Sequence, residues 1–541
     1  MVCEGKEEIE GIMISHLKSV TKTRLSILQE ISLFCVFLTI PLFRLGTTIL
    51  GSQTLTPAKI LVVVTFLLWI TNILINRDSG NIATILREKA NIFILLFLVF
   101  SFVSLINVRY FRDETVAEIF SRIKMLMLYF LIVGIIRDRQ TLKRAILAFI
   151  IGSLLTTGVG LYEMATGKAF FKETYRFGIE TAKKVVGLQQ TVYGGVGRVQ
   201  GLYSDAGFHA HAMVIFFGLA LPWLFYGASK KVKIFTGILL IGYVMNIIGT
   251  GARVGWVALG AALFISMFFL KHKHKYTIWA ISLISVIIIF LALSLNPHVP
   301  TAERLSTKGD ISLQWRLDTN RVGLEMVRNN PVLGVGTGNY LTEYHNYLDI
   351  RPRLSRIHYG WLHNSYLQIW AENGTIGLLV FLFFLIAIFI GLLKAHLNAV
   401  DREMKILALG LMAAFTGFAV EFAGIPALNQ ELGWTIFGLA VALISIFREE
   451  KEQNRSKNEV SGKNNFLYPG PDEYSASPTK RPSEKSRVKS DIEEADQLIS
   501  QGRYAEAFDV YRRCLSIEPD NEVILQRIEE LKTLVKLLRK G

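Results

Sequence analysis

The chain has 541 residues, 51% of them hydrophobic, with a mean hydropathy of +0.38 and a formal net charge of +15. A chain this apolar is not an ordinary soluble domain, although its charge raises nucleic acid as a partner. The charge distribution argues against nucleic acid, because residues 449–541 hold 17 Lys and Arg against 18 Asp and Glu. The excess lies on the loops of the apolar part, which favours anionic lipid or an anionic substrate.

Apolar runs of about 20 residues, the length that crosses the hydrocarbon core of a bilayer, recur through the first 447 residues. They follow a lead-in of 24 residues that has no cleavable-signal pattern. The pattern predicts an all-α, polytopic membrane protein of about twelve spans. The predicted spans lie near residues 31–50, 59–76, 91–108, 115–136, 142–165, 206–227, 232–249, 252–270, 276–295, 374–393, 404–424 and 431–447.

Short loops predict the orientation, because Lys and Arg are retained in the cytoplasm. Basic segments such as "RDRQTLKR", "SKKVK" and "KHKHK" fall at every second loop, whereas "GTGAR" and "PALNQ" fall between them. Both termini are therefore predicted to be cytoplasmic, and two large loops, about 166–205 and 296–364, to be extracytoplasmic. These two predicted outer loops are nonetheless basic, although basic residues usually lie on the cytoplasmic side. This favours a functional role for some of their Lys and Arg residues.

Three ionisable residues are predicted to lie on the same outer face. Arg198 precedes a span, Arg253 lies in a short turn, and His363 ends the second outer loop. The arginine fork suits a diphosphate, and histidine suits proton transfer near neutral pH. Asn364 is predicted to cap the next helix, whose dipole disfavours a protonated His363. This pattern suggests a reaction on a lipid-linked diphosphate; the plain structural alternative for Arg253 is a snorkelling interfacial residue.

Other candidates receive no role from the sequence. Glu163, Glu421 and Arg122 are charges inside predicted spans. His209 and His211 form one His-x-His pair without an obvious third ligand, so we expect no metal site and no cofactor. The three cysteines are too far apart for a disulfide framework or a zinc site: Cys3, Cys35 and Cys514.

Residues 296–377 resemble the shared domain of O-antigen ligases and O-antigen polymerases. The resemblance rests on "WRLDTNRVGLEMVRNNPVLGVGTGNY" and "HNSYLQIWAENGTIG". The ligase pattern is His, then Asn, Ser or Gln, nine residues, and then Gly followed by a small residue. It falls here on His363, Asn364, Gly374 and Gly377.

The resemblance implies a metal-independent membrane glycosyltransferase that moves a glycan from undecaprenyl diphosphate to an acceptor on the periplasmic side. The functional histidine of the family matches His363, and its two functional arginines match Arg198 and Arg253. Arg316 matches a recurrent arginine of the large loop and is predicted to bind the diphosphate with Arg198 and Arg253. The chain departs from many relatives at "YSDAGFHAHAMV", where they carry a Pro-Asn pair, and this departure bears on the acceptor pocket.

The predicted function is therefore an inverting, O-antigen ligase-like transferase of the bacterial inner membrane, with membrane lipid around it. Its donor would be an undecaprenyl-diphosphate-linked glycan, and its acceptor lipid A–core or a similar molecule. Three alternatives remain open: a polymerase that extends the glycan on its carrier, a protein-glycosylating ligase, and a transporter of lipid-linked glycans. A transporter should place its charges near the midplane of its spans.

The predicted domains are a membrane domain over 1–448, a flexible linker over 449–489 and a tetratricopeptide-like helical unit over 490–541. About one and a half repeats are present, fewer than the roughly three that a stable array needs. The unit is therefore predicted to dimerise or to bind a cytoplasmic protein, the alternative being a solvated helical hairpin or a chain that acts chiefly as a scaffold. The residues that carry the pattern are Gly502, Tyr504, Ala507, Tyr511, Cys514 and Pro519.

Overall fold

The computed structural model shows two compact units, Met1–Asn458 and Glu459–Gly541, which we describe separately. In the first unit, and along the helix that leads out of it, the structure describes residues 25–43, 47–49, 53–76, 87–108, 113–168, 170, 198–203, 205–226, 229–270, 275–295, 311–347 and 361–464. In the second unit it describes scattered positions between 491 and 531.

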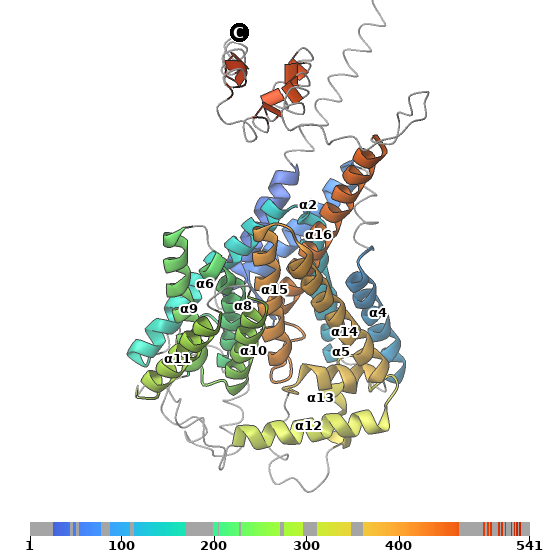
Figure 1. Cartoon of the computed structure of the whole chain (residues 1–541). Helices are drawn as coiled ribbons and strands as arrows, with labels where there is room; N and C mark the ends of the chain where they lie inside the picture. Colours follow the sequence, from blue (N-terminus) through green and yellow to red (C-terminus); the bar gives the residue numbers. More distant parts are fainter. Residues whose placement is uncertain are drawn as a thin grey trace, which may run out of the picture. The chain divides into compact units, whose positions relative to one another are not determined.

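The first unit is a bundle of helices (Figure 1). After a helix over Leu25–Thr39, the chain forms α2 (Pro57–Asn76), α4 (Lys89–Val103), α5 (Asp113–Ile135), α6 (Arg139–Thr166), α8 (Ala206–Tyr226), α9 (Lys230–Gly249), α10 (Arg253–Phe269), α11 (Lys275–Ser294), α12 (Ile311–Asn329), α13 (Tyr340–Glu343), α14 (Ser365–Asn398), α15 (Arg402–Glu421) and α16 (Glu431–Asn464). Two short 3-10 helices follow α4 and α13, over Ser104–Asn107 and Tyr344–Tyr347.

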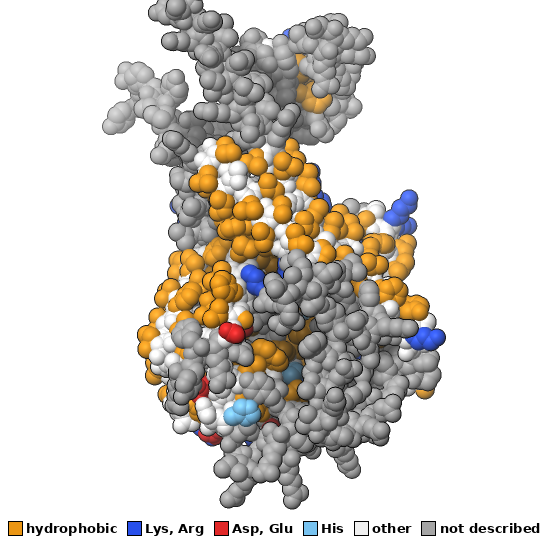
Figure 2. Space-filling model, turned by 180° about the vertical axis from the view of Figure 1, so that it is seen from behind, with side chains coloured by type: hydrophobic (Ala, Val, Ile, Leu, Met, Phe, Trp, Pro, Cys, Tyr) orange, Lys and Arg blue, Asp and Glu red, His pale blue; other side chains and the backbone are white. Residues whose placement is uncertain are grey.

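Eight of the described helices are long and apolar enough to cross a membrane: α2, α4, α6, α8, α9, α14, α15 and α16. Three shorter apolar helices accompany them. Apolar side chains also cover much of the described surface on the face in Figure 2. On a soluble protein such a surface would be unusual, but in a bilayer it faces lipid. The predicted all-α, polytopic membrane fold is therefore confirmed.

The first predicted span, 31–50, is wrong in its second half. Its helix ends at Thr39, and the chain then forms a small antiparallel hairpin of β1 (Thr47–Ile49) and β2 (Gln53–Leu55). Pro41 explains the end of the helix, because proline lacks the backbone N–H and disfavours helical geometry at the residue before it. The β-branched residues of β1 then favour an extended strand.

The helix α8 lies at the centre of the packing, in contact with α9, α10 and α15. Its side chains from Ala210 to Phe217 are all buried, so it faces protein on every side. On the other side of the bundle, α14 packs against α4 and α15. These contacts fix where α8, α10 and α14 begin, and the candidate site lies there.

The helix α14 is broken at Gly374, whose φ of 66° lies in the left-handed region. A loop over 331–339 fills the break and satisfies the backbone groups that the break exposes. Val335 N–H donates to the Ala371 carbonyl at 2.9 Å, and Thr375 N–H donates to the Pro331 carbonyl at 2.8 Å. The first half of α14, over 365–373, is thus a short helix with its own anchorage.

We expect Gly374→Ala to destabilise the protein, because a Cβ atom there would lie 2.1 Å from the Val332 carbonyl oxygen. The positive φ adds strain of about 1–3 kcal/mol for a residue with a side chain. The matched control is Gly260→Ala in α10, where a Cβ atom would meet nothing within 4 Å. Thermal unfolding in detergent should show a lower Tm for the first variant and an unchanged or higher Tm for the second. Equal Tm values would contradict this account of the break.

In the second unit the described residues include a small buried apolar cluster. It contains Ala495, Ala507, Val510, Tyr511, Cys514, Ile524, Ile528 and Leu531. Three residues of the predicted repeat pattern, Ala507, Tyr511 and Cys514, thus lie in a core, whereas Gly502, Tyr504 and Pro519 lie outside the described residues. The repeat assignment stays a prediction. Residues 449–464, at the start of the predicted linker, continue α16.

Candidate functional site

We call one end of the first unit the site end: α6, α9 and α15 end there, and α8, α10 and α14 begin there. The helix α12 lies across this end, at the bottom of Figure 1. The turn over 422–427 connects the starting helices, because Ser365 at the start of α14 donates its backbone N–H to the Phe422 carbonyl at 2.9 Å. The Ser365 hydroxyl also donates to the Ile425 carbonyl at 2.7 Å.

The same turn reaches the other two helix starts. A Cβ atom on Gly424 would lie 2.4 Å from the side chain of Val254, in the first turn of α10. A Cβ atom on Gly207, in the first turn of α8, would lie 3.7 Å from the Ile425 side chain. The starts of α8, α10 and α14 therefore meet around one short turn.

Arg198 is held against the turn that carries Arg253. The Arg198 Nε donates to the Thr250 carbonyl at 2.7 Å, and Val199 N–H donates to the Gly249 carbonyl at 3.3 Å. Arg253 follows three residues after Thr250, as the first residue of α10. The structure thus places the two predicted arginines on adjoining segments at the site end.

Glu163 binds the backbone of the segment that follows Arg198. It is one of the three charges to which the sequence alone assigned no role. The Glu163 side chain is buried, and its Oε2 accepts from the backbone N–H groups of Gln200 at 2.8 Å and Gly201 at 2.9 Å. A buried carboxylate without partners would be costly, so these bonds explain the charge in α6. The sequence signal was an acidic residue near the end of an apolar span, without any hint of its partner.

His363 lies directly before α14, where Asn364 is the N-cap and its side chain accepts from Leu367 N–H at 3.1 Å. The His363 ring packs against Trp315 of α12, with ring centroids 5.4 Å apart. Its Nδ1 lies 2.9 Å from the Trp361 carbonyl oxygen, which only accepts, so Nδ1 carries the hydrogen. The neutral ring then has its basic lone pair on Nε2, the arrangement that a general base needs.

Burial lowers the pKa of His363 below its ordinary value, and the positive charge of Arg316 lowers it further. The Trp361 carbonyl and Asp205 act in the opposite direction. Arg316 therefore lies close enough to influence the ring, although it belongs to α12. A third predicted arginine thus acts electrostatically on the histidine.

The lowered pKa makes a pH prediction. If His363 is a general base, it is active when neutral, so the rate of the reaction should rise with pH through the pKa of His363 and stay high above it. We expect the acid limb of kcat/KM to lie below about pH 6.5, the ordinary histidine value. Arg316→Gln removes a positive charge and should move this limb to higher pH, whereas Arg316→Lys should not. A limb that stays in place in Arg316→Gln would contradict the electrostatic contact.

His209 and His211 have separate partners inside the bundle. His209 Nε2 lies 2.8 Å from Asn246 Oδ1, and His211 Nδ1 lies 2.6 Å from Glu421 Oε2. The described residues contain no group of three or more His, Cys, Asp or Glu side chains suited to a metal ion. Glu421, the second charge without a role, is thus paired with His211 beneath the first turn of α10.

Arg122, the third such charge, is bound at the break of α14. Its guanidinium contacts Glu372 and Asn373, the two residues directly before Gly374. Gly377 lies one turn beyond, and a Cβ atom there would come 2.4 Å from the Asn373 Cβ. Gly374 and Gly377, the small residues of the motif, thus make room for the polar contacts at this break.

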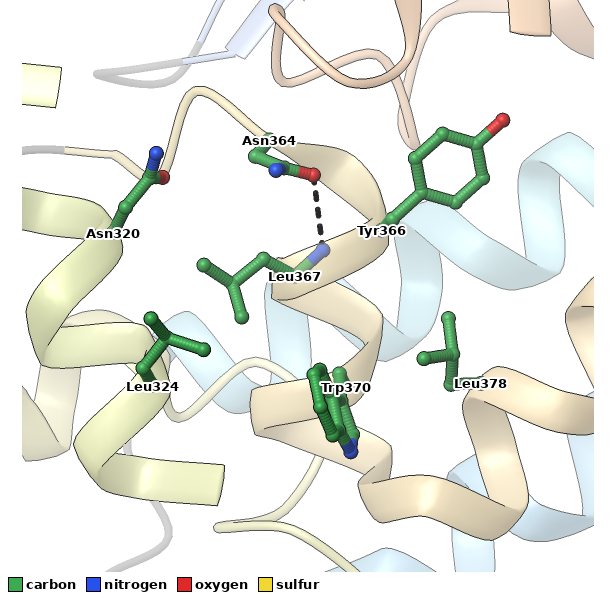
Figure 3. Close-up of a pocket in the computed structure, with 7 residues that line it drawn as sticks. All are labelled: Asn320, Leu324, Asn364, Tyr366, Leu367, Trp370 and Leu378. Carbon is green, nitrogen blue, oxygen red and sulfur yellow. Dashed lines mark hydrogen bonds between the residues drawn. The ribbon is translucent and has the colours of Figure 1, made fainter. Parts of the chain in front are cut away.

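A hollow of about 330 Å³ opens beside the first half of α14 (Figure 3). It begins at Asn364, next to His363, and runs between α12 and α14 to Leu378, beyond the break. Leucine side chains and the Trp370 indole make most of its wall apolar, with the amides of Asn320 and Asn364 at one end (Figure 3). The residues that line it are Asn320, Leu324, Asn364, Tyr366, Leu367, Trp370 and Leu378.

These features define a helical membrane protein with arginines, a neutral histidine and an apolar hollow at one end of its bundle. Residues 235–382 match the protein-family model described as O-antigen ligase. This range contains Arg253, Arg316 and His363, whereas Arg198 lies before it. The match supports the predicted resemblance to membrane enzymes of the ligase and polymerase type.

The chain is also similar to an uncharacterised protein of Haemophilus influenzae, with 26% identity over 189 residues. This similarity covers 32% of the chain and 47% of that protein, so the chain spans about half the length of this relative. It supports a common origin of the matched segment and gives no activity.

Proposed function

We propose that the chain is a membrane glycosyltransferase of the O-antigen ligase type. It would move a glycan from undecaprenyl diphosphate to an acceptor hydroxyl at the site end. The observation that carries the proposal is the placement of Arg198, Arg253 and His363 around adjoining helix starts, within or beside the segment that matches the family model.

The proposed chemistry is one displacement. His363 Nε2 takes the proton of the acceptor hydroxyl, and the hydroxyl oxygen attacks the anomeric carbon of the glycan. The bond from that carbon to the diphosphate oxygen breaks, and its electron pair leaves with the diphosphate. Arg198 and Arg253 bind this anion, since guanidinium groups stay charged and offer paired donors to phosphate oxygens. The configuration of the sugar is inverted, and the positive charge comes from the arginines without a metal ion.

The proposed orientation follows from the short loops. The basic segments "RDRQTLKR", "SKKVK" and "KHKHK" belong to the connections at the ends of helices opposite the site end. Their charge favours the cytoplasm, so the site end would face the periplasm of the bacterial inner membrane, with both termini cytoplasmic. The second unit, on the cytoplasmic side, would then bind a protein partner.

The positions of Glu163 and Glu421 favour an enzyme over a transporter, whereas Arg122 lies within α5 and is bound to Glu372 of α14. Glu163 lies in the last turn of α6, and Glu421 is the last residue of α15. Both therefore lie at the site end and bind groups of the protein itself. A transporter would instead present such charges near the midplane, where its substrate crosses.

The hollow beside His363 is the proposed place for an apolar part of the acceptor. Leu324→Trp should fill it and raise KM for a lipid acceptor several-fold, with a smaller effect on kcat. Leu379→Trp, at an exposed position next to Leu378, is the matched control and should behave like the wild type. Initial rates at varied acceptor concentration measure both effects. An unchanged KM in Leu324→Trp would remove the hollow from the proposal.

The test of the proposed reaction uses purified protein in lipid discs, an undecaprenyl-diphosphate-linked glycan, and lipid A–core as acceptor. A single transfer onto lipid A–core is the expected product of a ligase. A ladder on the carrier lipid, formed without lipid A–core, would identify a polymerase. Movement of the donor between leaflets without transfer would replace the proposal by a transporter.

A further inference from the structure

We propose that Arg122 is a positioning residue, which fixes the short helix over 365–373 and so aims His363 at the acceptor. The proposal rests on the proposed function for the role of His363. It assigns a task to a buried charge in a span that neither the motif nor the family match explains.

The contacts of Arg122 converge on the break in α14. Its side chain is only 3% exposed, and Nη2 donates to Glu372 Oε2 at 2.7 Å. Nη1 donates to Asn373 Oδ1 at 2.9 Å and to the Ser101 hydroxyl of α4 at 2.9 Å. One guanidinium group on α5 thus joins α4 to the last two residues of the short helix.

The loop that fills the break belongs to the same network. The Thr337 hydroxyl accepts from Arg122 Nη1 at 3.3 Å and from Asn373 Nδ2 at 2.8 Å. Gly336 N–H donates to the Glu372 carbonyl at 3.0 Å. The end of the short helix is therefore held by side chains and by backbone, while the kink at Gly374 separates it from the long second half of α14.

The other end of the short helix is tied to α5 as well. Glu118, one turn before Arg122, accepts from Asn429 Nδ2 at 2.7 Å. Asn429 follows the turn over 422–427, which binds the Ser365 backbone and hydroxyl. Arg122 thus binds the end of the short helix directly, and Glu118 holds its start through Asn429 and the turn over 422–427.

This arrangement predicts more than stability. A buried ion pair is weak evidence for stability, because desolvation offsets much of the attraction. A misplacement of about 1 Å at a catalytic group can cost about 10²-fold in rate. We therefore expect Arg122 to act on kcat through the position of His363. A merely structural residue would change the amount of folded protein and leave the rate per folded molecule unchanged.

The key variant is Arg122→Lys, which keeps the charge but lacks the planar fork that joins Glu372 to Asn373. Glu372→Gln, which keeps the size of its side chain, gives a second test that does not depend on the folding of the first variant. The matched control is Arg139→Lys. Arg139 forms ion pairs with Asp401 and Glu450 at the start of α6. The start of α6 lies about 40 Å along the helix from Thr166, the residue with which α6 ends at the site end.

Four quantities are measured on folded, full-length protein: the Tm, the kcat for transfer, the KM for the donor, and the rate at which diethyl pyrocarbonate modifies His363. The modification is read by mass spectrometry. We expect Arg122→Lys and Glu372→Gln to lose about 10- to 100-fold in kcat. The donor KM should change less than about threefold, and the modification rate of His363 should change severalfold. Arg139→Lys should alter neither kcat nor His363 reactivity.

The proposal is overturned if folded Arg122→Lys and Glu372→Gln keep the wild-type kcat and the wild-type His363 reactivity. It is also overturned if His363 reactivity changes equally in Arg139→Lys, because the effect would then be general. A wild-type protein without transfer activity would refute the proposed function alone. The modification rate of His363 would still decide whether Arg122 positions it.

Discussion

The largest expected effect is that of His363→Ala, which should lower kcat by about 10²–10⁴-fold, the usual contribution of a general acid or base. The protein should stay folded, because His363 and the Trp315 ring that it contacts are both only partly buried. The donor should still bind, since the arginines remain. Transfer is followed with a fluorescent glycan donor in lipid discs, and donor binding is measured separately.

The matched control for this prediction is His345→Ala. His345 belongs to the same outer segment, before α14, and is exposed. Its replacement should leave kcat close to that of the wild type. His363→Gln, which keeps a polar side chain without a base of suitable pKa, should be as inactive as His363→Ala. Substantial transfer by either His363 variant would refute its role as the base.

The second large effect is expected for Arg253→Gln. The guanidinium of Arg253 would bind the diphosphate as negative charge grows on its leaving oxygen, and removal of one such donor costs typically about 10²–10³-fold in kcat. Arg253→Lys should recover only part of this loss, because an ammonium group lacks the paired donors. Rates at saturating donor separate this effect from weaker binding of the ground state.

Arg198→Gln supplies the internal comparison. If Arg198 and Arg253 bind the same diphosphate, the double variant should lose less than the product of the two single losses. Lys230→Gln, an exposed cation at the start of α9 and away from the site end, controls for general charge effects and should keep full activity. Independent, multiplying losses for the two arginines would argue that they act at different places.

The helices of the first unit could be predicted from hydropathy, because a run of apolar residues gives both the length and the environment of a span. The cap at Asn364 could be predicted as well, since Asn before an apolar helix has a local cause. The end of the first helix was missed although Pro41 gives a local signal. Apolar residues on both sides of the proline concealed it from a reading by hydropathy alone.

The polar network at the break of α14 could not be predicted from the sequence. Arg122 and Glu372 are 250 residues apart, and nothing local in either segment indicates the other. Charged residues inside apolar spans need partners, so the sequence does single out Arg122, Glu163 and Glu421 as residues whose partners must be found. Their partners depend on how the helices pack: Glu163 and Glu421 lie at the site end, whereas Arg122 lies within α5 and binds the residues before the break of α14.

The candidate arginines illustrate the same limit. Counting spans predicted that these arginines lie on the same outer face of the membrane domain. It could not predict which residues they contact. The structure holds Arg198 on the Thr250 carbonyl, three residues before Arg253, and Arg316 acts electrostatically on His363. The diphosphate-binding role of Arg316 stays a prediction, beside its electrostatic influence on the histidine.

The most direct test of the central claim is a structure of the protein with an undecaprenyl diphosphate sugar analogue bound in lipid discs. The account predicts phosphate oxygens within about 3 Å of the guanidinium groups of both Arg198 and Arg253. It also predicts that His363 Nε2 faces the side of the anomeric carbon opposite the diphosphate. A diphosphate bound elsewhere, or a histidine turned away from the sugar, would contradict it.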